Sequence, residues 1–324
     1  MYRYIIKRLL QVALVVLGVS VVIFTIMYFC PGDPVKMSLG EFYTPEQYEA
    51  KKIQLGLDQP FLIQLLSFLR DTFLHFDLGT SYFTNADVRT ELFLRLPRTA
   101  MIASICCVLQ VLVAIPLGIT AATHQNGFID RFCIFLAMLS ISIPSFWFAM
   151  ILILVFSLQL HLLPSSGIEH WYCYILPCIA NSMISIGGLA RLTRSQMLEV
   201  IHSDYITTAR AKGVSERSIL YSHALPNALI PVVTNVGTHF GAALGGTVVI
   251  ETVFAIPGVG LYMMNAVSNR DYPIVRGGVT LLAILFSFVI LLVDLLYAYI
   301  DPRIKAQYER QSKRKVRVSR EKEA

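Results

Sequence analysis

The sequence predicts an all-α integral membrane protein with six transmembrane helices. Of its 324 residues, 55% are hydrophobic and 15% are charged, and the mean hydropathy is +0.62. Soluble domains carry about 25% charged residues. Six apolar stretches of roughly 20 residues can each cross a hydrocarbon core of ~30 Å. In chain order these are Leu9–Cys30, Thr99–Ala122, Phe132–Leu158, Tyr172–Ala190, Leu229–Ile250 and Gly277–Ile300.

The lysines and arginines orient these spans, because basic residues in short loops resist translocation. They flank the first span, occupy the segment 201–227 and fill the tail 301–324, whereas residues 159–172 contain none. Both termini and segment 201–227 are therefore predicted to be cytoplasmic. The basic tail is expected to meet anionic membrane lipid and no nucleic acid.

The stretch 31–98 follows the first span and is predicted to be an external loop with short helices. Thr44-Pro45-Glu46-Gln47 combines a helix cap, a proline at the first helical position and a glutamine three residues after the cap. Asp58-Gln59-Pro60 opens a second helix with an apolar face.

Segment 201–227 is polar and basic but carries helix start and stop signals. Ser203 or Asp204 can cap a first helix, which Gly213 ends in a left-handed conformation. Ser215 can cap a second helix, which Pro226 is expected to stop. The pattern predicts two short helices with a glycine elbow.

The fifth span contains glycines at four-residue spacing, which strip one helix face of side chains. This face, formed by Gly237, Gly241 and Gly245, is expected to pack closely on another helix. The spacing leaves open whether that helix belongs to the same chain or to a second subunit.

Two ionisable residues of the fifth span are candidates for a transport path or its gate, since such groups are costly in a membrane. His239 lies deep and is expected to be a neutral histidine hydrogen-bonded across the bundle, in preference to a proton relay. Glu251 lies near a span end, where hydration is the simpler expectation. The sequence shows no phosphate-binding loop, zinc pair or nucleophile elbow, so no catalytic site is predicted.

Segment 201–227 resembles the cytoplasmic EAA loop of permease subunits of ATP-binding-cassette (ABC) importers. The dipeptide, oligopeptide and nickel branch is matched by Asp204, Tyr205, Ala209, Arg210, Lys212, Gly213, Leu225, Pro226 and Asn227. The sequences LPRT at 96–99 and ETVFAIPGVG at 251–260 also look like this branch, and the long first external loop is similar to its B-type subunit.

This resemblance implies a type I ABC importer permease fold, with a five-helix core over residues 99–300 after the first helix in residues 1–30. The chain would form half of a path for di- or oligopeptides, beside a second, C-type permease subunit. Two cytoplasmic ATPases would use ATP and Mg²⁺ and engage segment 201–227, while an extracytoplasmic binding protein delivers the cargo. The resemblance also implies a bacterial cytoplasmic (inner) membrane, and no cofactor in this chain. Nickel or glutathione transport within the same branch, and an ion-coupled secondary carrier, are the alternatives.

Overall fold

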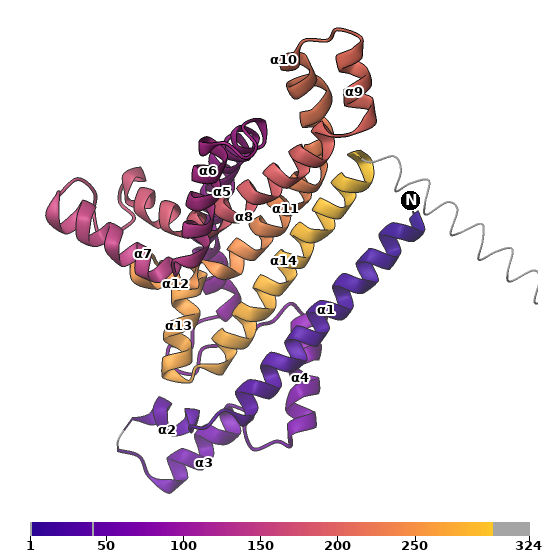
Figure 1. Ribbon diagram of the computed structural model, residues 1–324. Coiled ribbons are helices and arrows are strands. Elements are labelled where there is room, and N and C mark those ends of the chain that lie inside the picture. Colours follow the sequence, from indigo (N-terminus) through magenta and orange to yellow (C-terminus); the bar gives the residue numbers. More distant parts are fainter. Residues whose placement is uncertain (1, 41, 301–324) are drawn as a thin grey trace, which may run out of the picture.

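The computed structural model describes residues 2–40 and 42–300 as a bundle of α-helices (Figure 1). Within these residues, five helices are long and apolar enough to span a membrane: Ile5–Phe29, Val88–Thr123, Trp171–Ile201, Glu216–Gly245 and Tyr272–Leu295. A sixth crossing requires two helices that meet at a sharp bend. The helical membrane fold is confirmed, and the tail 301–324 lies outside the described residues.

The third expected span is this bent pair. Helix α6 (Phe128–Ser142) meets α7 (Ser145–Leu152), which continues through a π-helical segment (Ile153–Gln159), at 99°. Pro144 lacks an N–H and disfavours a helical conformation in the preceding residue. Ile143 accordingly has an extended backbone, with φ −89° and ψ 124°. The span expected over Phe132–Leu158 is therefore a pair of helices bent at Pro144 and not one straight helix.

Three short helices follow α1 (Tyr2–Phe29): α2 (Pro34–Leu39), α3 (Pro45–Gln54) and α4 (Phe61–Leu74). The capping box predicted for α3 is confirmed. Thr44 Oγ1 accepts a hydrogen bond from Gln47 N at 3.2 Å, and Gln47 Oε1 accepts one from Thr44 N at 2.9 Å. Helix α4 packs on α1 through Phe61 and Phe68, whose ring centroids lie 5.7 and 5.4 Å from that of Phe24.

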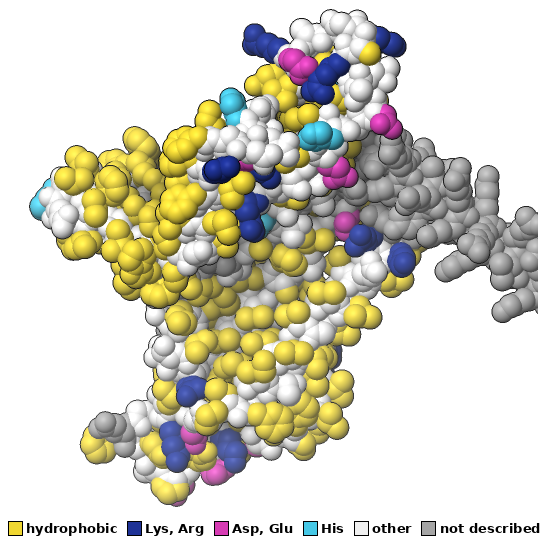
Figure 2. All heavy atoms as spheres, in the orientation of Figure 1, with side chains coloured by type: hydrophobic (Ala, Val, Ile, Leu, Met, Phe, Trp, Pro, Cys, Tyr) yellow, Lys and Arg dark blue, Asp and Glu magenta, His cyan; other side chains and the backbone are white. Residues whose placement is uncertain are grey.

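The centre of the bundle consists of α5 (Val88–Thr123), α8 (Ile175–Ile201), α11 (Leu225–Gly246) and α14 (Tyr272–Ile300). A short 3₁₀ turn (Trp171–Tyr174) precedes α8. Helix α14 packs between α1 and α11, and an ion pair of 3.0 Å between Arg8 and Asp294 joins α1 to α14. Figure 2 shows hydrophobic side chains over the middle of the molecule and charged side chains gathered toward its two ends.

The glycine face of α11 packs on α14 of the same chain. A Cβ atom on Gly237 would lie 2.1 Å from Val293 Cγ2, and one on Gly241 would lie 3.0 Å from Phe286 Cδ2. At Gly245 no described atom lies within 4 Å of the Cβ position. The packed face therefore meets α14 at Gly237 and Gly241, and for Gly245, which no described neighbour reaches, close packing stays a prediction.

Glu251 is buried at the junction of α5 with α12 (Val248–Val253) and α13 (Val259–Asn269). Its Oε1 accepts hydrogen bonds from Thr99 Oγ1 at 2.7 Å and Thr247 Oγ1 at 3.0 Å, and its Oε2 accepts one from Leu261 N at 3.0 Å. A Cβ on Gly258 would lie 2.4 Å from the Glu251 Cδ, so the glycine makes room for the carboxylate. The expectation of a hydrated Glu251 was wrong, because α13 folds over it.

Replacing Gly237 with leucine should destabilise the purified chain, because the added side chain collides with Val293. Overpacking of this kind costs about 1–3 kcal/mol. The midpoint of thermal unfolding in detergent measures the effect, and Gly245→Leu on the same helix is the matched control. Equal midpoints for the two variants would contradict the assigned contact between α11 and α14.

Glu251→Gln should also lower the unfolding midpoint. The amide replaces one carboxylate oxygen with a donor NH2 group, so at least one of the three donors around it loses its acceptor, at a cost of about 1–3 kcal/mol. Glu49→Gln, at an exposed position on α3 with 61% of its side chain accessible, should leave the midpoint unchanged. An unaltered midpoint for Glu251→Gln would show that the carboxylate is not needed as an acceptor.

Candidate functional site

The predicted elbow projects from the bundle at the same end as the start of α1 (Figure 1). It consists of α9 (Asp204–Ala211) and α10 (Glu216–Ser218), and a π-helical segment (Ile219–Ala224) continues α10 into α11. The expected stop at Pro226 was wrong. In the π-helical segment the hydrogen bonds join residues five positions apart, so the chain tolerates the missing N–H of Pro226 at the start of α11. The helical path therefore runs without a break from Glu216 to Gly245.

Gly213 shapes the turn of the elbow as predicted, with φ +79°. Its N–H donates to Arg210 O at 2.9 Å, and the N–H of Val214 donates to Ala209 O at 3.3 Å. This pair of bonds is the Schellman motif, which satisfies the last carbonyls of a helix. Ser215 then caps α10 by accepting a hydrogen bond from Ser218 N at 3.4 Å.

The inner side of the elbow is apolar and fixed to the bundle. Ile206 of α9 and Ile219 after α10 are 0% and 1% exposed and pack with Met197 of α8 and Ala122 of α5. Each buried side chain of this size contributes about 1.5–3 kcal/mol. The elbow is therefore a rigid extension of the helices that carry it.

The outer side of the elbow is polar and exposed. It presents Asp204, Tyr205, Arg210, Lys212 and Gly213, and next to them Pro226 and Asn227 at the start of α11, while Ala209 and Leu225 are half-buried beneath. Asn227 Nδ2 donates to Tyr205 Oη at 3.1 Å and ties α11 to α9.

Glu216 begins α10 and Ser203 precedes α9, and each makes a polar contact. Arg210 Nε donates to Glu216 Oε1 at 2.7 Å across the turn, and this hydrogen bond raises the pKa of the arginine. The pair is exposed, so solvent screening leaves it little effect on stability. Ser203 occupies the cap position of α9, but its hydroxyl donates to Val200 O at 2.6 Å, so the expected side-chain cap is absent there.

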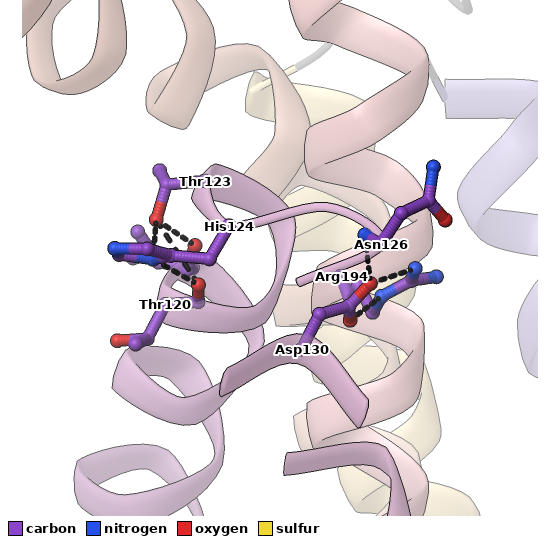
Figure 3. Close-up of polar contacts among 7 residues, drawn as sticks. Thr120, Thr123, His124, Asn126, Asp130 and Arg194 are labelled. Carbon is purple, nitrogen blue, oxygen red and sulfur yellow. Dashed lines mark hydrogen bonds and ion pairs between the residues drawn. The ribbon is translucent and has the colours of Figure 1, made fainter. Parts of the chain in front are cut away.

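A salt bridge missed in the sequence braces the base of the elbow (Figure 3). Arg194 of α8 donates through Nε and Nη2 to the two oxygens of Asp130 on α6, at 2.6 and 2.7 Å. Asp130 is 2% exposed and also accepts from Asn126 N at 2.8 Å. An acid in the first turn of α6, next to Arg131 and before an uncharged stretch, was the available signal. The pair joins the α5–α6 turn to the helix that leads into α9.

Polar side chains also meet in a cavity of about 230 Å³ inside the bundle, here called the membrane cavity. His239 of α11, Gln110 of α5 and Asn181 of α8 line it, with Cys107 and Ser185. The His239 ring makes no hydrogen bond to any residue in 2–40 or 42–300 that the structure describes, so the expected bond across the bundle is not found. Glu251 is not among the lining residues, so the two candidate gate residues lie in separate environments.

Comparison with known proteins assigns this architecture to a family. Residues 114–306 match the family described as binding-protein-dependent transport system inner membrane component, and residues 1–103 match the N-terminal part of such membrane components.

Relatives that align over nearly their whole length are also named as permease proteins. A putative peptide transport system permease protein of Brucella abortus is 40% identical over 94% of this chain and 99% of its own length. A dipeptide transport system permease protein of Alkalihalophilus pseudofirmus is 36% identical over 94% of this chain and 100% of its own. A glutathione transport system permease protein of Pectobacterium atrosepticum is 39% identical over 94% of this chain and 99% of its own length.

Solved structures share the fold. The inward-facing MetNI methionine ABC transporter matches with a TM-score of 0.54 and 17% identity, over 65% of this chain and 96% of that one. An amino acid ABC transporter with histidines matches with a TM-score of 0.51 and 13% identity, over 66% of this chain and 94% of that one. Such subunits are not enzymes and hold no cofactor; they work with an ATPase and a binding protein. This chain belongs to the family of binding-protein-dependent transport system inner membrane components, the multi-pass permease subunits of ABC importers.

Proposed function

We propose that this chain is the B-type permease subunit of an importer for short peptides, and that its elbow receives the movement of a cytoplasmic ATPase. The observation that carries the proposal is the elbow itself. It exposes a polar outer side, its apolar inner side is fixed to the bundle, and it continues directly into α8 and α11. A push on such a projection moves the helices that carry it.

The proposed topology puts the elbow and the N-terminus in the cytoplasm, and residues 31–98 outside. The basic residues of segment 201–227 support this orientation, because basic loops stay inside. A C-type permease subunit would complete the path, two ATPases would bind at the cytoplasmic side, and a binding protein would dock outside. The exposed Gly245 on α11 is one surface available to the second permease subunit.

The cargo is proposed to be a di- or oligopeptide. Relatives that cover nearly the whole chain are named as peptide and dipeptide permeases. Glutathione, itself a short peptide thiol, is the second candidate, since a permease named for it is 39% identical. These names favour a peptide over a nickel chelate.

The membrane cavity is proposed to be part of the cargo path. Polar groups at membrane depth are costly and mark substrate paths, and this cavity gathers His239, Gln110 and Asn181 from three helices. Neutral amides and an imidazole can exchange hydrogen bonds with peptide groups, which need partners when water is removed.

Gly213→Val should impair coupling to the ATPase without preventing membrane insertion. A β-branched residue is strained at φ +79°, by about 1–2 kcal/mol, which distorts the surface that meets the ATPase. Cargo uptake and cargo-stimulated ATP hydrolysis by the assembled transporter should both fall at least severalfold.

Gly213→Asn is the matched control, because asparagine adopts left-handed backbone and no described atom lies within 4 Å of the Cβ position. It should keep most of the uptake. Normal uptake and hydrolysis in Gly213→Val would remove the coupling role of the elbow.

His239→Leu should reduce cargo uptake about tenfold, a loss that corresponds to one hydrogen bond of about 1.4 kcal/mol. The adjacent Thr238 is exposed and does not line the membrane cavity, so Thr238→Leu is the control and should transport normally. Uptake by the assembled transporter in vesicles, at equal protein level, is the measurement. Equal uptake by both variants would exclude the cavity from the path.

A further inference from the structure

Arg276 of α14 has no close ion-pair partner among the described residues, and its charge is felt only at longer range by the Asp271 carboxylate. Its guanidinium carbon lies 5.1 Å from the ring centroid of Phe24 and 5.3 Å from that of Phe68, so it is held by aromatic rings of α1 and α4. Nη2 donates to Tyr82 Oη at 3.4 Å, and the buried Nε has no hydrogen-bond partner. Within residues 2–40 and 42–300, no carboxylate lies within 4.0 Å of this guanidinium. Arg276 is half-buried, and a partly desolvated cation without a close carboxylate favours the binding of an anion.

Arg276 lines a cavity of about 390 Å³, here called the outer cavity, between α14, the end of α1 and the short helices α2 and α3. Lys52 of α3 adds a second positive charge to its wall. Asp33 adds a negative charge, and its Oδ2 accepts a hydrogen bond from Tyr48 Oη at 2.9 Å. A volume of this size is within the range of small-molecule sites, roughly 300–1,000 Å³. The outer cavity therefore offers separate places for an anion and a cation of one ligand.

The depth of Arg276 bears on the kind of ligand that can reach the outer cavity. Arg276 and Asp294 both lie on α14, 18 residues apart, which is about 27 Å at a rise of 1.5 Å per residue. That distance is close to the ~30 Å thickness of the hydrocarbon core. Since Asp294 pairs with Arg8 toward the end of the molecule that carries the elbow, Arg276 lies at the level of the opposite headgroup layer.

The surroundings of the outer cavity fit lipid chains. Tyr28 and Phe29 at the end of α1 are 42% and 72% exposed, and Leu62 and Leu66 of α4 are 66% and 65% exposed. These apolar side chains, at headgroup depth and beside a cavity with both charges, suit the glycerol and upper acyl region of a phospholipid.

We propose that the outer cavity binds the headgroup of an outer-leaflet phospholipid, with the phosphate at Arg276 and Lys52 and an ethanolamine ammonium at Asp33. The lipid would join α1 to α14 and to α3 at the external end, as the Arg8–Asp294 pair joins α1 to α14 at the other end. This site is independent of the membrane cavity and of the elbow.

The test uses the purified full-length chain, stripped of lipid in detergent and titrated with diacyl phosphatidylethanolamine. Lipid retained by native mass spectrometry and the rise in unfolding midpoint are the two readouts. Arg276→Gln should weaken binding about tenfold, whereas Arg70→Gln, at an exposed arginine of α4 outside the outer cavity, should bind as the unmodified chain does. Equal binding by the two variants would overturn the proposal.

Two further variants keep the test informative if Arg276→Gln folds poorly. Lys52→Gln changes a more accessible side chain and should weaken binding severalfold; unchanged binding would count against the site. Asp33→Asn keeps a good cap for α2. It should weaken binding of phosphatidylethanolamine but not of phosphatidylglycerol, which has no ammonium group, and equal effects on both lipids would overturn the assigned orientation.

The same titration separates a lipid from other sources of the anion. Inorganic phosphate and a dipeptide, each at millimolar concentration, should not displace the diacyl lipid, because they lack acyl chains. Displacement by the dipeptide in an Arg276-dependent manner would overturn the lipid assignment and identify the cavity as a cargo site.

Discussion

The need to satisfy every polar group without water governs this protein, because the hydrocarbon core offers no hydrogen-bond partners. The buried Glu251 carboxylate meets this need with three donors from α5, the start of α12 and α13. The Asp130 carboxylate meets it with Arg194 and a backbone N–H. Both groups link helices that lie far apart in the chain, so the same bonds that satisfy the charges hold the bundle together.

Local signals were sufficient for elements whose conformation depends on neighbouring residues. The capping box at Thr44 and Gln47, the left-handed Gly213 and the cap at Ser215 all follow from side chains within a few positions. The apolar stretches located most of the long helices, since length and hydropathy are sufficient for that purpose.

Features that depend on tertiary contacts could not be predicted in the same way. Pro144 broke a helix whereas Pro226 did not, because a π-helical segment before Pro226 accommodates the missing donor. The burial of Glu251 depends on α13, which folds back over the end of α12 with glycines at 258 and 260 next to the carboxylate. The Asp130–Arg194 bridge joins positions 64 residues apart, and the gathering of His239, Gln110 and Asn181 depends on three helices meeting.

The unbroken helical path from Glu216 to Gly245 has a mechanical consequence. It contains 30 residues, which corresponds to a rod about 45 Å long at 1.5 Å per residue. A rotation of only about 5° at one tip would carry the opposite tip through about 4 Å, by the geometry of such a rod. Small angular movements of the elbow would thereby become displacements of several ångströms at the other end of α11, wide enough to part or close neighbouring side chains there.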